Sequence, residues 1–206
     1  MLLIKGRASS SNVQEVLWCC DELGIPYERQ DIGRQFGGND TAEFLALNPN
    51  GTVPVIIEDG FTLWESNAVV RYLAAKHGAG SLYPNDLRER ARADRWMDWQ
   101  LAVLGRVFTP LFHGLVRDAP EDRDLAKIAA ARDNVEAKLA MLDRYLADSA
   151  WVAGDNFTMG DIPVGIYGYR WYKLEIERHP LPNLERWYGA LAQRPAFAKH
   201  VMVDLG

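Results

Sequence analysis

Cysteine is scarce in this sequence: Cys19 and Cys20 are the only two among 206 residues. A structural metal site or a disulfide framework needs spaced cysteines, and adjacent residues of a helix point in different directions. The sequence also contains no Cys-x-x-Cys motif. We therefore expect two buried thiols that pack as small hydrophobic groups, and no metal centre.

Long apolar runs and clusters of positive charge are missing as well. No run approaches the roughly 20 residues of a membrane-spanning helix, and the first residues, MLLIKGR, become charged too early for a signal peptide. The 23 Lys and Arg residues are outnumbered by 28 Asp and Glu, so the formal net charge is −5. Such a balance disfavours binding to a phosphate backbone. We expect a cytoplasmic protein that binds neither membrane nor nucleic acid.

The first 80 residues alternate short strand-like runs with amphipathic helical runs. Strands are predicted at 2–5, 26–32, 53–57 and 61–64, and helices at 13–24, 40–48 and 65–78. The first strand–helix–strand unit requires a parallel strand pair, whereas the turn EDG at 58–60 requires an antiparallel one. The predicted order βαβαββα with a mixed four-stranded sheet is that of a thioredoxin-like α/β fold.

Helical periodicity dominates the rest of the chain, after a Gly-, Ser- and Pro-rich stretch that reads as a linker. The expected domains are 1–79, a linker at 80–87, and an all-helical domain at 88–206. A long helix begins near residue 87, and Pro110 is expected to bend its end. Further helices are predicted at 124–148, 158–173 and 183–193, with a short one after Pro195. A helical bundle is the simplest packing of these segments.

The segment NFTMGDIPVGI, 156–166, carries the clearest helix-start signal of this half. Thr158 can cap the helix while Asp161, three residues later, reaches back to the backbone as in a capping box. Pro163, Gly165 and Gly168 are poor helix formers. A helix that contains them must be held by close packing, so we expect it in the core.

Three stretches now stand in a recognisable order: NPNGTVPVI at 48–56, WESNAVVRYL at 64–73 and FTMGDIPV at 157–164. Together they resemble the cytosolic glutathione S-transferase superfamily, and the resemblance covers essentially the whole chain. It implies an enzyme that joins glutathione, as co-substrate, to small hydrophobic electrophiles, without a metal and as a homodimer. The serine-rich start of the first helix makes a theta- or nu-like member the expected type.

The resemblance also implies a binding site for glutathione around NPNGTVP. Pro54 is expected to follow a cis peptide bond, with the backbone of Val53 free to pair with the cysteinyl part of glutathione and Thr52 beside it. A proline where a strand begins is physically suited to this, because it ends internal pairing and leaves an edge for a ligand.

Glu65 and Ser66 match the acidic residue and serine that begin the third helix in the family. The first turn of a helix offers unpaired N–H groups and a positive dipole end, which can hold the γ-glutamyl carboxylate at Ser66. Glu65 would then pair with the ammonium group of glutathione. Without the family resemblance, the simplest interpretation is that Ser66 caps the helix and that the Glu65 carboxylate offsets the helix dipole.

The catalytic position falls among three consecutive serines in GRASSSNVQEV, residues 6–16. Alignment with the family places Ser10 on the catalytic hydroxyl and Asn12 on a residue that contacts the sulfur, while Ser9 and Ser11 stay open as alternatives. Hydrogen bonds and the helix N-terminus together suffice to lower a thiol pKa from about 8.5 by about two units. No tyrosine or cysteine occupies this position, which disfavours the tyrosine- and cysteine-type mechanisms.

Two parts of the site are less defined by the sequence. Asn39 aligns with a residue that holds the glycyl end of glutathione, but the expected basic residue is missing from GGNDTAEF, so Arg34 or an arginine of the helical half would substitute. The electrophile pocket should be lined by the helical half, and its candidate residues are Trp99, Arg106, Phe112, His113, Tyr169 and Trp171, although aromatic residues at helical spacing more often face a core.

Two other functions compete with conjugation. Nu-like relatives with a Ser or Thr and an Asn at the site act as glutathione-dependent disulfide reductases, and Asn12 favours that alternative. Other members of the superfamily are non-catalytic binding or scaffold modules that have lost the activating residue or the acidic–serine pair. This chain retains both features.

Overall fold

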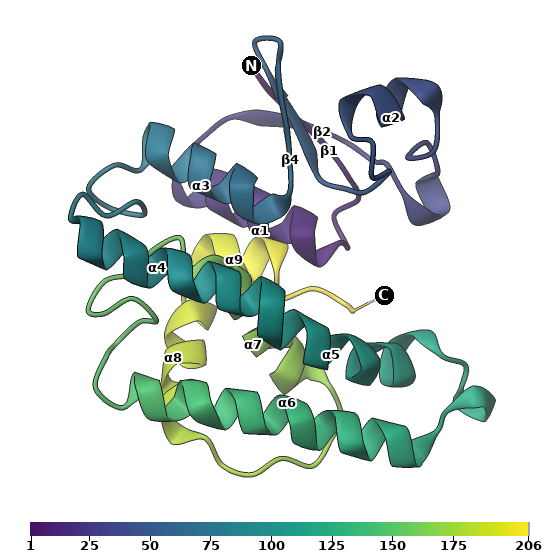
Figure 1. Ribbon diagram of the computed structural model, residues 1–206, viewed down its shortest axis with the longest axis vertical. Coiled ribbons are helices and arrows are strands. Elements are labelled where there is room, and N and C mark those ends of the chain that lie inside the picture. Colours follow the sequence, from purple (N-terminus) through teal and green to yellow (C-terminus); the bar gives the residue numbers. More distant parts are fainter. Residues whose placement is uncertain (206) are drawn as a thin grey trace. The chain divides into compact units, whose positions relative to one another are not determined.

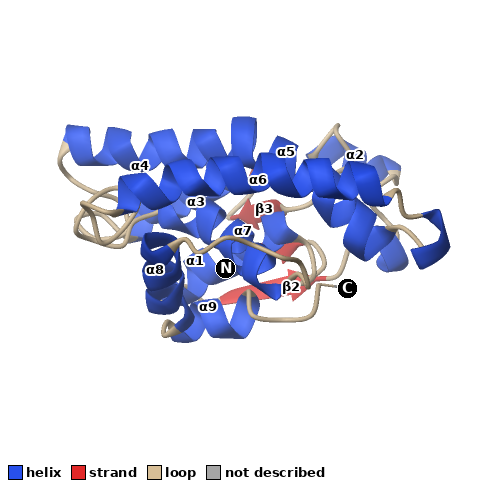
Figure 2. Cartoon of the chain, turned by 90° about the horizontal axis from the view of Figure 1, so that it is seen from below, coloured by secondary structure: helices blue, strands red, loops and turns tan. Residues whose placement is uncertain are grey.

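The computed structural model describes residues 1–205, which form two compact units. The first unit contains Met1–Asn85 together with Pro195–Asp204, and the second contains Asp86–Arg194 and Leu205. All strands of the sheet belong to the first unit, whereas the second is helical (Figure 2).

The first unit has the predicted thioredoxin-like order. Its elements are β1 (Leu2–Lys5), α1 (Ser11–Glu22), β2 (Tyr27–Gln30), a 3₁₀ turn (Arg34–Phe36), α2 (Ala42–Leu47), β3 (Val55–Glu58), β4 (Phe61–Trp64), α3 (Ser66–His77) and, from the end of the chain, α9 (Pro195–His200). The sheet order is β2-β1-β3-β4, with β1 parallel to β2 and the other two pairs antiparallel. The mixed sheet is thus confirmed.

Two strands are shorter than predicted, and proline explains both starts. Pro26 and Pro54 lie just before β2 and β3, because a residue without an N–H cannot donate to the sheet ladder. The predicted hairpin turn is confirmed: Asp59 and Gly60 both have positive φ, 50° and 84°, as a two-residue type I′ turn requires.

The register of the sheet gathers the starts of two helices at one edge. Lys5 pairs with Val55, and Val55 pairs with Trp64, so the end of β1, the start of β3 and the end of β4 lie in one row. Because α1 follows β1 and α3 follows β4, the N-termini of both helices emerge at this edge. Below it lies a core whose fully buried side chains include Ile4 and Ile56.

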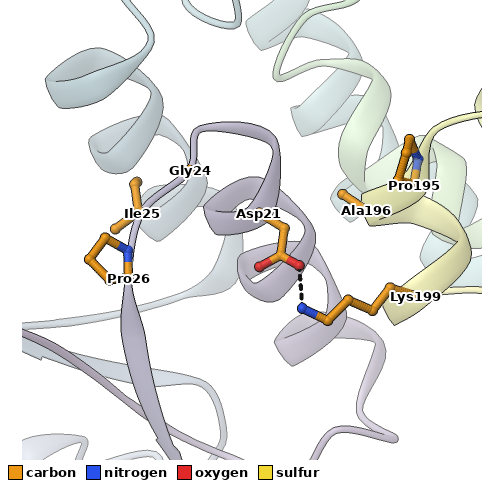
Figure 3. A pocket seen from close by; sticks show the side chains of 7 residues that line it. All are labelled: Asp21, Gly24, Ile25, Pro26, Pro195, Ala196 and Lys199. Atoms are coloured by element: carbon orange, nitrogen blue, oxygen red, sulfur yellow. Dashed lines mark hydrogen bonds and ion pairs between the residues drawn. The ribbon is translucent and has the colours of Figure 1, made fainter.

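The segment from Pro195 was expected in the helical half, but α9 packs against α1 and belongs to the first unit (Figure 1). The ring centroids of Trp18 and Phe197 are 4.8 Å apart in an edge-to-face arrangement. One carboxylate oxygen of Asp21 lies 2.6 Å from the Lys199 ammonium and 2.8 Å from the His200 ring nitrogen. Figure 3 shows the Asp21–Lys199 pair in the hollow between α1 and α9.

We expect Asp21→Asn to lower the free energy of unfolding by about 1 kcal/mol at pH 7, since it removes the carboxylate that pairs with the Lys199 ammonium and contacts the His200 ring. Burial raises the pKa of the Asp21 carboxyl, but the hydrogen bonds from Lys199 and His200 outweigh it and the net shift is downward. Such a carboxylate stabilises the fold above about pH 4 and loses this contribution as the pH falls through its folded pKa.

Urea unfolding at pH 7 and near pH 3 measures this effect. The difference between wild type and Asp21→Asn should shrink at the lower pH, while the exposed Asp40→Asn control should show little difference at either pH. A difference of equal size at both values would contradict the assignment.

The second unit is a helical bundle. Its elements are α4 (Leu87–Trp99), a π-helical turn (Gln100–Leu104), α5 (Gly105–Phe112), a second π-helical turn (His113–Arg117), a 3₁₀ turn (Pro120–Asp122), α6 (Leu125–Leu146), α7 (Asp161–Lys173) and α8 (Pro182–Ala192). The predicted long helix is therefore interrupted twice. Pro110 lies inside α5, and the second π-helical turn begins three residues later, at His113. Helix α4 packs on α7, and α5 packs on α6.

At the start of α7 the predicted contact between Thr158 and Asp161 is confirmed, but the N-cap residue is Gly160, no side chain caps it, and the helix begins at Asp161. The Asp161 carboxylate accepts the N–H of Thr158 at 2.9 Å, and the Thr158 hydroxyl accepts the N–H of Gly160 at 3.3 Å. A Cβ on Gly160 would lie 2.9 Å from the backbone of Ala93 in α4, so only glycine fits there. Close packing holds this helix in the core, as expected.

Candidate active site

A hollow of about 390 Å³ opens at the sheet edge where α1 begins, a volume within the range of small-molecule sites. It brings together the loops before α1, after β2 and before β3. Of the predicted site residues it contains Ser10, Ser11, Asn12, Asn39, Thr52 and Val53, and it also contains Arg7, Gly33, Arg34 and Gly51. Ser9, Pro54, Glu65 and Ser66 are not among its lining residues, although the sheet register places Pro54 and Glu65 at the same edge.

Ser10 is the N-cap residue of α1, yet its hydroxyl makes no capping hydrogen bond. Its carbonyl accepts the N–H of Gln14 at 2.8 Å, and its own N–H donates to the carbonyl of Arg7 at 3.2 Å. The side chain is only 8% exposed. A buried hydroxyl that the helix does not use is available to a ligand, beside the first-turn N–H groups of α1.

The serines on either side of Ser10 are less suited to binding a ligand in this way. Ser11 donates to the side-chain oxygen of Asn12 at 3.4 Å, and Asn12 is exposed at the surface of the hollow. Ser9 does not line the hollow. Among the three serines the geometry therefore favours Ser10, with Ser11 as the alternative.

The peptide bond between Val53 and Pro54 is cis, as predicted. In the described part of the chain, neither the N–H nor the C=O of Val53 makes a backbone hydrogen bond. The loop before it is held by Asn48, whose buried amide donates to the Thr52 carbonyl at 2.8 Å and to its hydroxyl at 3.2 Å. Asn48 was not singled out from the sequence, although an Asx-type turn in NPNG is a usable signal.

Glu65 and Ser66 stand at the start of α3 with their side chains uncommitted. Glu65 has a positive φ of 70°, unusual for a residue other than glycine, and its carbonyl accepts the N–H of Val69 at 2.9 Å. Ser66 is the first helical residue rather than the cap, and no side chain caps this helix. Strained backbone of this kind costs about 1–3 kcal/mol and is concentrated at ligand sites.

The other residues that line the hollow make it polar and positively charged. The Asn39 amide donates to the Gly51 carbonyl at 2.9 Å, and Arg34 is exposed at the start of its 3₁₀ turn. Arg7, which the sequence reasoning did not single out, comes from the loop between β1 and α1. The lining residues thus include two arginines and no acidic side chain, in a chain whose net charge is −5.

The two cysteines take no part in this site. Both are free and fully buried. Burial raises the pKa of the Cys20 thiol to about 12 and raises that of Cys19 as well, so neither forms a thiolate at neutral pH. The prediction of two structural thiols is confirmed.

The candidate residues for the electrophile pocket are divided between core and surface of the second unit. Phe112, Tyr169 and Trp171 are buried, whereas Arg106 and His113 are exposed. The Arg170 guanidinium lies 4.3 Å from the centroid of the Phe112 ring. The pocket itself stays a prediction.

A second hollow lies elsewhere on the first unit. The hollow of Figure 3, about 330 Å³, lies at the other end of α1, about 18 Å away along the helix, and holds none of the predicted site residues. The described residues include no group of three or more His, Cys, Asp or Glu placed to hold a metal ion. No helix in residues 1–205 is long and apolar enough to cross a membrane.

Comparison with known proteins finds two family models along the chain. Residues 9–76 match the glutathione S-transferase N-terminal domain, and residues 106–195 match the corresponding C-terminal domain. The chain is 44% identical to glutathione S-transferase GstB of Escherichia coli K12 over 207 residues, which covers 100% of both proteins. It is 29% identical to glutathione S-transferase D7 of Drosophila melanogaster over 170 residues, 80% of this chain and 72% of that protein.

A solved structure is similar over the same length. The theta class glutathione S-transferase of Xanthomonas axonopodis pv. citri, determined with glutathione bound, shares 47% of its sequence with this chain. The TM-score is 0.96, and the match covers 100% of this chain and 99% of that one.

Proposed function

This chain belongs to the glutathione S-transferase family, and from that premise we propose that it activates the thiol of glutathione through Ser10 and transfers the glutathionyl group to small hydrophobic electrophiles. The observation that carries the proposal is the unused, buried hydroxyl of Ser10 at the N-terminus of α1, in a hollow that Val53 also lines. Glutathione bound there is the co-substrate, and its thiol is the nucleophile.

The energetics of thiol activation are sufficient without a general base. A thiol with a pKa of about 8.5 becomes mostly ionised at pH 7 if that value falls by about two units, which corresponds to about 3 kcal/mol. A hydrogen bond from a hydroxyl to a charged sulfur supplies about 1.5–3 kcal/mol. The N-terminus of α1 adds about 0.3–1 kcal/mol, and Asn12 stands in the same turn. The thiolate then attacks the electrophile, and the leaving group departs.

The remaining contacts of glutathione are made at the same edge of the sheet, where α1 and α3 begin. The backbone of Val53 pairs with the cysteinyl unit as an added strand would. The start of α3 offers N–H groups and the Ser66 hydroxyl to the γ-glutamyl carboxylate, and Glu65 accepts the ammonium group. Thr52 and Asn39 contact the side of the ligand that leads to its glycyl end. The homodimer and the cytoplasmic location stay predictions.

A second candidate function is glutathione-dependent reduction of disulfides. Asn12 favours it, because this residue is exposed next to Ser11 in the hollow and can contact a sulfur atom without a reactive cysteine. A non-catalytic scaffold is disfavoured by the retained Ser10 and by the uncommitted Glu65–Ser66 pair.

Two parallel assays separate these functions. We expect turnover of an aromatic halide such as 1-chloro-2,4-dinitrobenzene to match or exceed glutathione-dependent reduction of a small disulfide such as hydroxyethyl disulfide. The site provides one activated thiolate, that of glutathione, and its partner is the uncharged hydroxyl of Ser10. We therefore expect conjugation to be at least as fast as disulfide reduction. Disulfide reduction that greatly exceeds conjugation would assign the enzyme to the second function, and no turnover in either assay would favour the scaffold.

A further inference from the structure

Asn48 is almost fully buried, yet its side chain holds the loop that leads to Val53. Only 1% of the residue is exposed. Its amide nitrogen donates to the Thr52 carbonyl at 2.8 Å, and its amide oxygen accepts the backbone N–H of Asn50 at 3.0 Å. A flip of the amide would set donor against donor and acceptor against acceptor, so these partners fix its orientation.

The backbone of Asn48 is itself held by its neighbours. Asn48 is the C-cap residue of α2, and its N–H donates to the carbonyl of Phe44, which is buried, at 2.9 Å. Its carbonyl accepts the N–H of Gly51 at 3.0 Å, and the Gly51 carbonyl accepts the Asn39 amide at 2.9 Å. The loop is thus attached at several points, and the amide of Asn48 is a fixed donor inside it.

The bond from Asn48 determines the direction of the next N–H group. The peptide bond between Thr52 and Val53 is trans, so its C=O and N–H lie in one plane and point in opposite directions. Because the Thr52 carbonyl points to the buried amide of Asn48, the Val53 N–H points away from it. No described residue accepts this N–H, and Val53 lines the hollow.

We propose that Asn48 is a positioning residue for glutathione, which aims the Val53 N–H at the ligand by holding the Thr52 carbonyl. This inference rests on the proposed function, because it takes glutathione as the ligand of the hollow. Without the amide donor, the peptide unit between Thr52 and Val53 is free to turn over. It then presents a carbonyl where the ligand backbone needs a donor, and two acceptors face each other.

Binding of S-methylglutathione tests this role, because its blocked sulfur removes thiol activation from the measurement. Calorimetry should show about 3- to 10-fold weaker binding to Asn48→Ala than to wild type, the range expected of one neutral hydrogen bond. Asn48→Asp should weaken binding further, because a carboxylate oxygen repels the Thr52 carbonyl and favours the reversed peptide. The matched control is Gln35→Glu, an exposed amide-to-acid change in the same unit, which should stay within about 2-fold of wild type.

Two readouts distinguish positioning from a purely structural role. In the conjugation assay, KM for glutathione should rise in Asn48→Ala while kcat at saturating glutathione stays within about 2-fold, since a backbone contact is made equally in the ground and transition states. In a backbone-assigned amide spectrum, the Val53 signal of wild type should move when S-methylglutathione binds, because its N–H gains an acceptor. The same signal should move less in Asn48→Ala.

Several outcomes would overturn the proposal. A Val53 signal that does not move when wild type binds the ligand would do so whether or not the variants fold. An Asn48→Ala protein that is less stable but binds S-methylglutathione like wild type would make the residue structural only. Equal weakening by Gln35→Glu and Asn48→Asp would trace the loss to added charge rather than to the lost donor.

Failure of the proposed function gives a different pattern. A wild type that binds S-methylglutathione with the expected movement of the Val53 signal, but transfers glutathione to no electrophile, would leave the role of Asn48 in place and overturn the proposed function alone. A wild type that binds neither glutathione nor S-methylglutathione would overturn both.

Discussion

Ser10→Ala is expected to lower kcat/KM for conjugation about 10- to 100-fold, because it removes the hydroxyl that we propose as the hydrogen-bond donor to the thiolate of bound glutathione. Loss of a hydrogen bond worth about 1.5–3 kcal/mol to a charged group should raise the pKa of that thiol by one to two units. The pH dependence of kcat/KM and the ultraviolet absorbance of the bound thiolate report this pKa directly. At pH 9, where the thiol ionises unaided, the variant should recover much of its activity.

Although Ser10 stands at a helix start, its substitution by alanine should leave the stability of the protein unchanged. Loss of an N-cap side chain generally costs about 0.5–2 kcal/mol, but the Ser10 hydroxyl makes no capping bond in this helix. Thermal unfolding of the variant should therefore match wild type closely. Ser9→Ala and Ser11→Ala are the neighbouring controls, and a larger loss of activity in Ser11→Ala would move the catalytic role to Ser11.

Asp161→Ala is expected to lower the free energy of unfolding by about 3–5 kcal/mol, the largest effect on stability that the fold predicts. The carboxylate is fully buried and accepts the N–H groups of Val152 at 3.0 Å and Thr158 at 2.9 Å, and the indole N–H of Trp187 at 2.9 Å. Alanine leaves these three donors without an acceptor, and each buried orphan costs about 1–3 kcal/mol. The melting temperature should fall by about 10 °C.

The same carboxylate gives the protein a pH signature. Burial raises the pKa of Asp161 to about 6, although the hydrogen bonds to Val152 and Thr158 oppose the shift. The folded protein holds this proton more tightly than the unfolded chain, so the stability contributed by this group falls as the pH rises from about 4 to about 6. Asp161→Ala should lack that component.

Denaturant unfolding of wild type, Asp161→Ala and Asp155→Ala measures both effects. Asp155 is exposed in the same loop and serves as the matched control, with an expected change within about 0.5 kcal/mol. A loss below 1 kcal/mol in Asp161→Ala would show that water or a local shift satisfies the three donors.

Much of the first unit could be predicted because its signals are local. The turn at Asp59 and Gly60, the cap of α2 at Thr41, which accepts the N–H of Phe44 at 3.3 Å, and the proline before β3 each act within a few residues. The order of strands then follows from the short connections. The same locality allowed Thr158 and Asp161 to be recognised as a helix start.

What the sequence could not show depends on contacts between distant segments. Arg7 meets Gly33 only because β1 and β2 run parallel and the hydrogen bonds of that pair continue past the strands, from Arg7 N–H to the Ile32 carbonyl. No spacing or motif signals that encounter. Similarly, Phe197 is one apolar residue in a short helix, and nothing nearby indicates that its partner is Trp18.

The π-helical turns escaped notice for a different reason. A π turn adds one residue to a helix and so shifts the apolar pattern by about 100° without erasing it. The periodicity of the sequence across Gln100–Leu104 therefore still predicts an ordinary helix. The shift lets α4 and α5 present different faces, the first to α7 and the second to α6.

The place of α9 in the first unit has a consequence for how the protein is made. Trp18 and Phe197 are separated by most of the chain, yet they pack in the same core, so the first unit is discontinuous and the helical bundle is an insertion within it. A ribosome adds about 5–20 residues per second and releases the N-terminal part first. The first unit of the nascent chain must therefore wait, with one wall of its core open to water, until α9 has emerged from the exit tunnel.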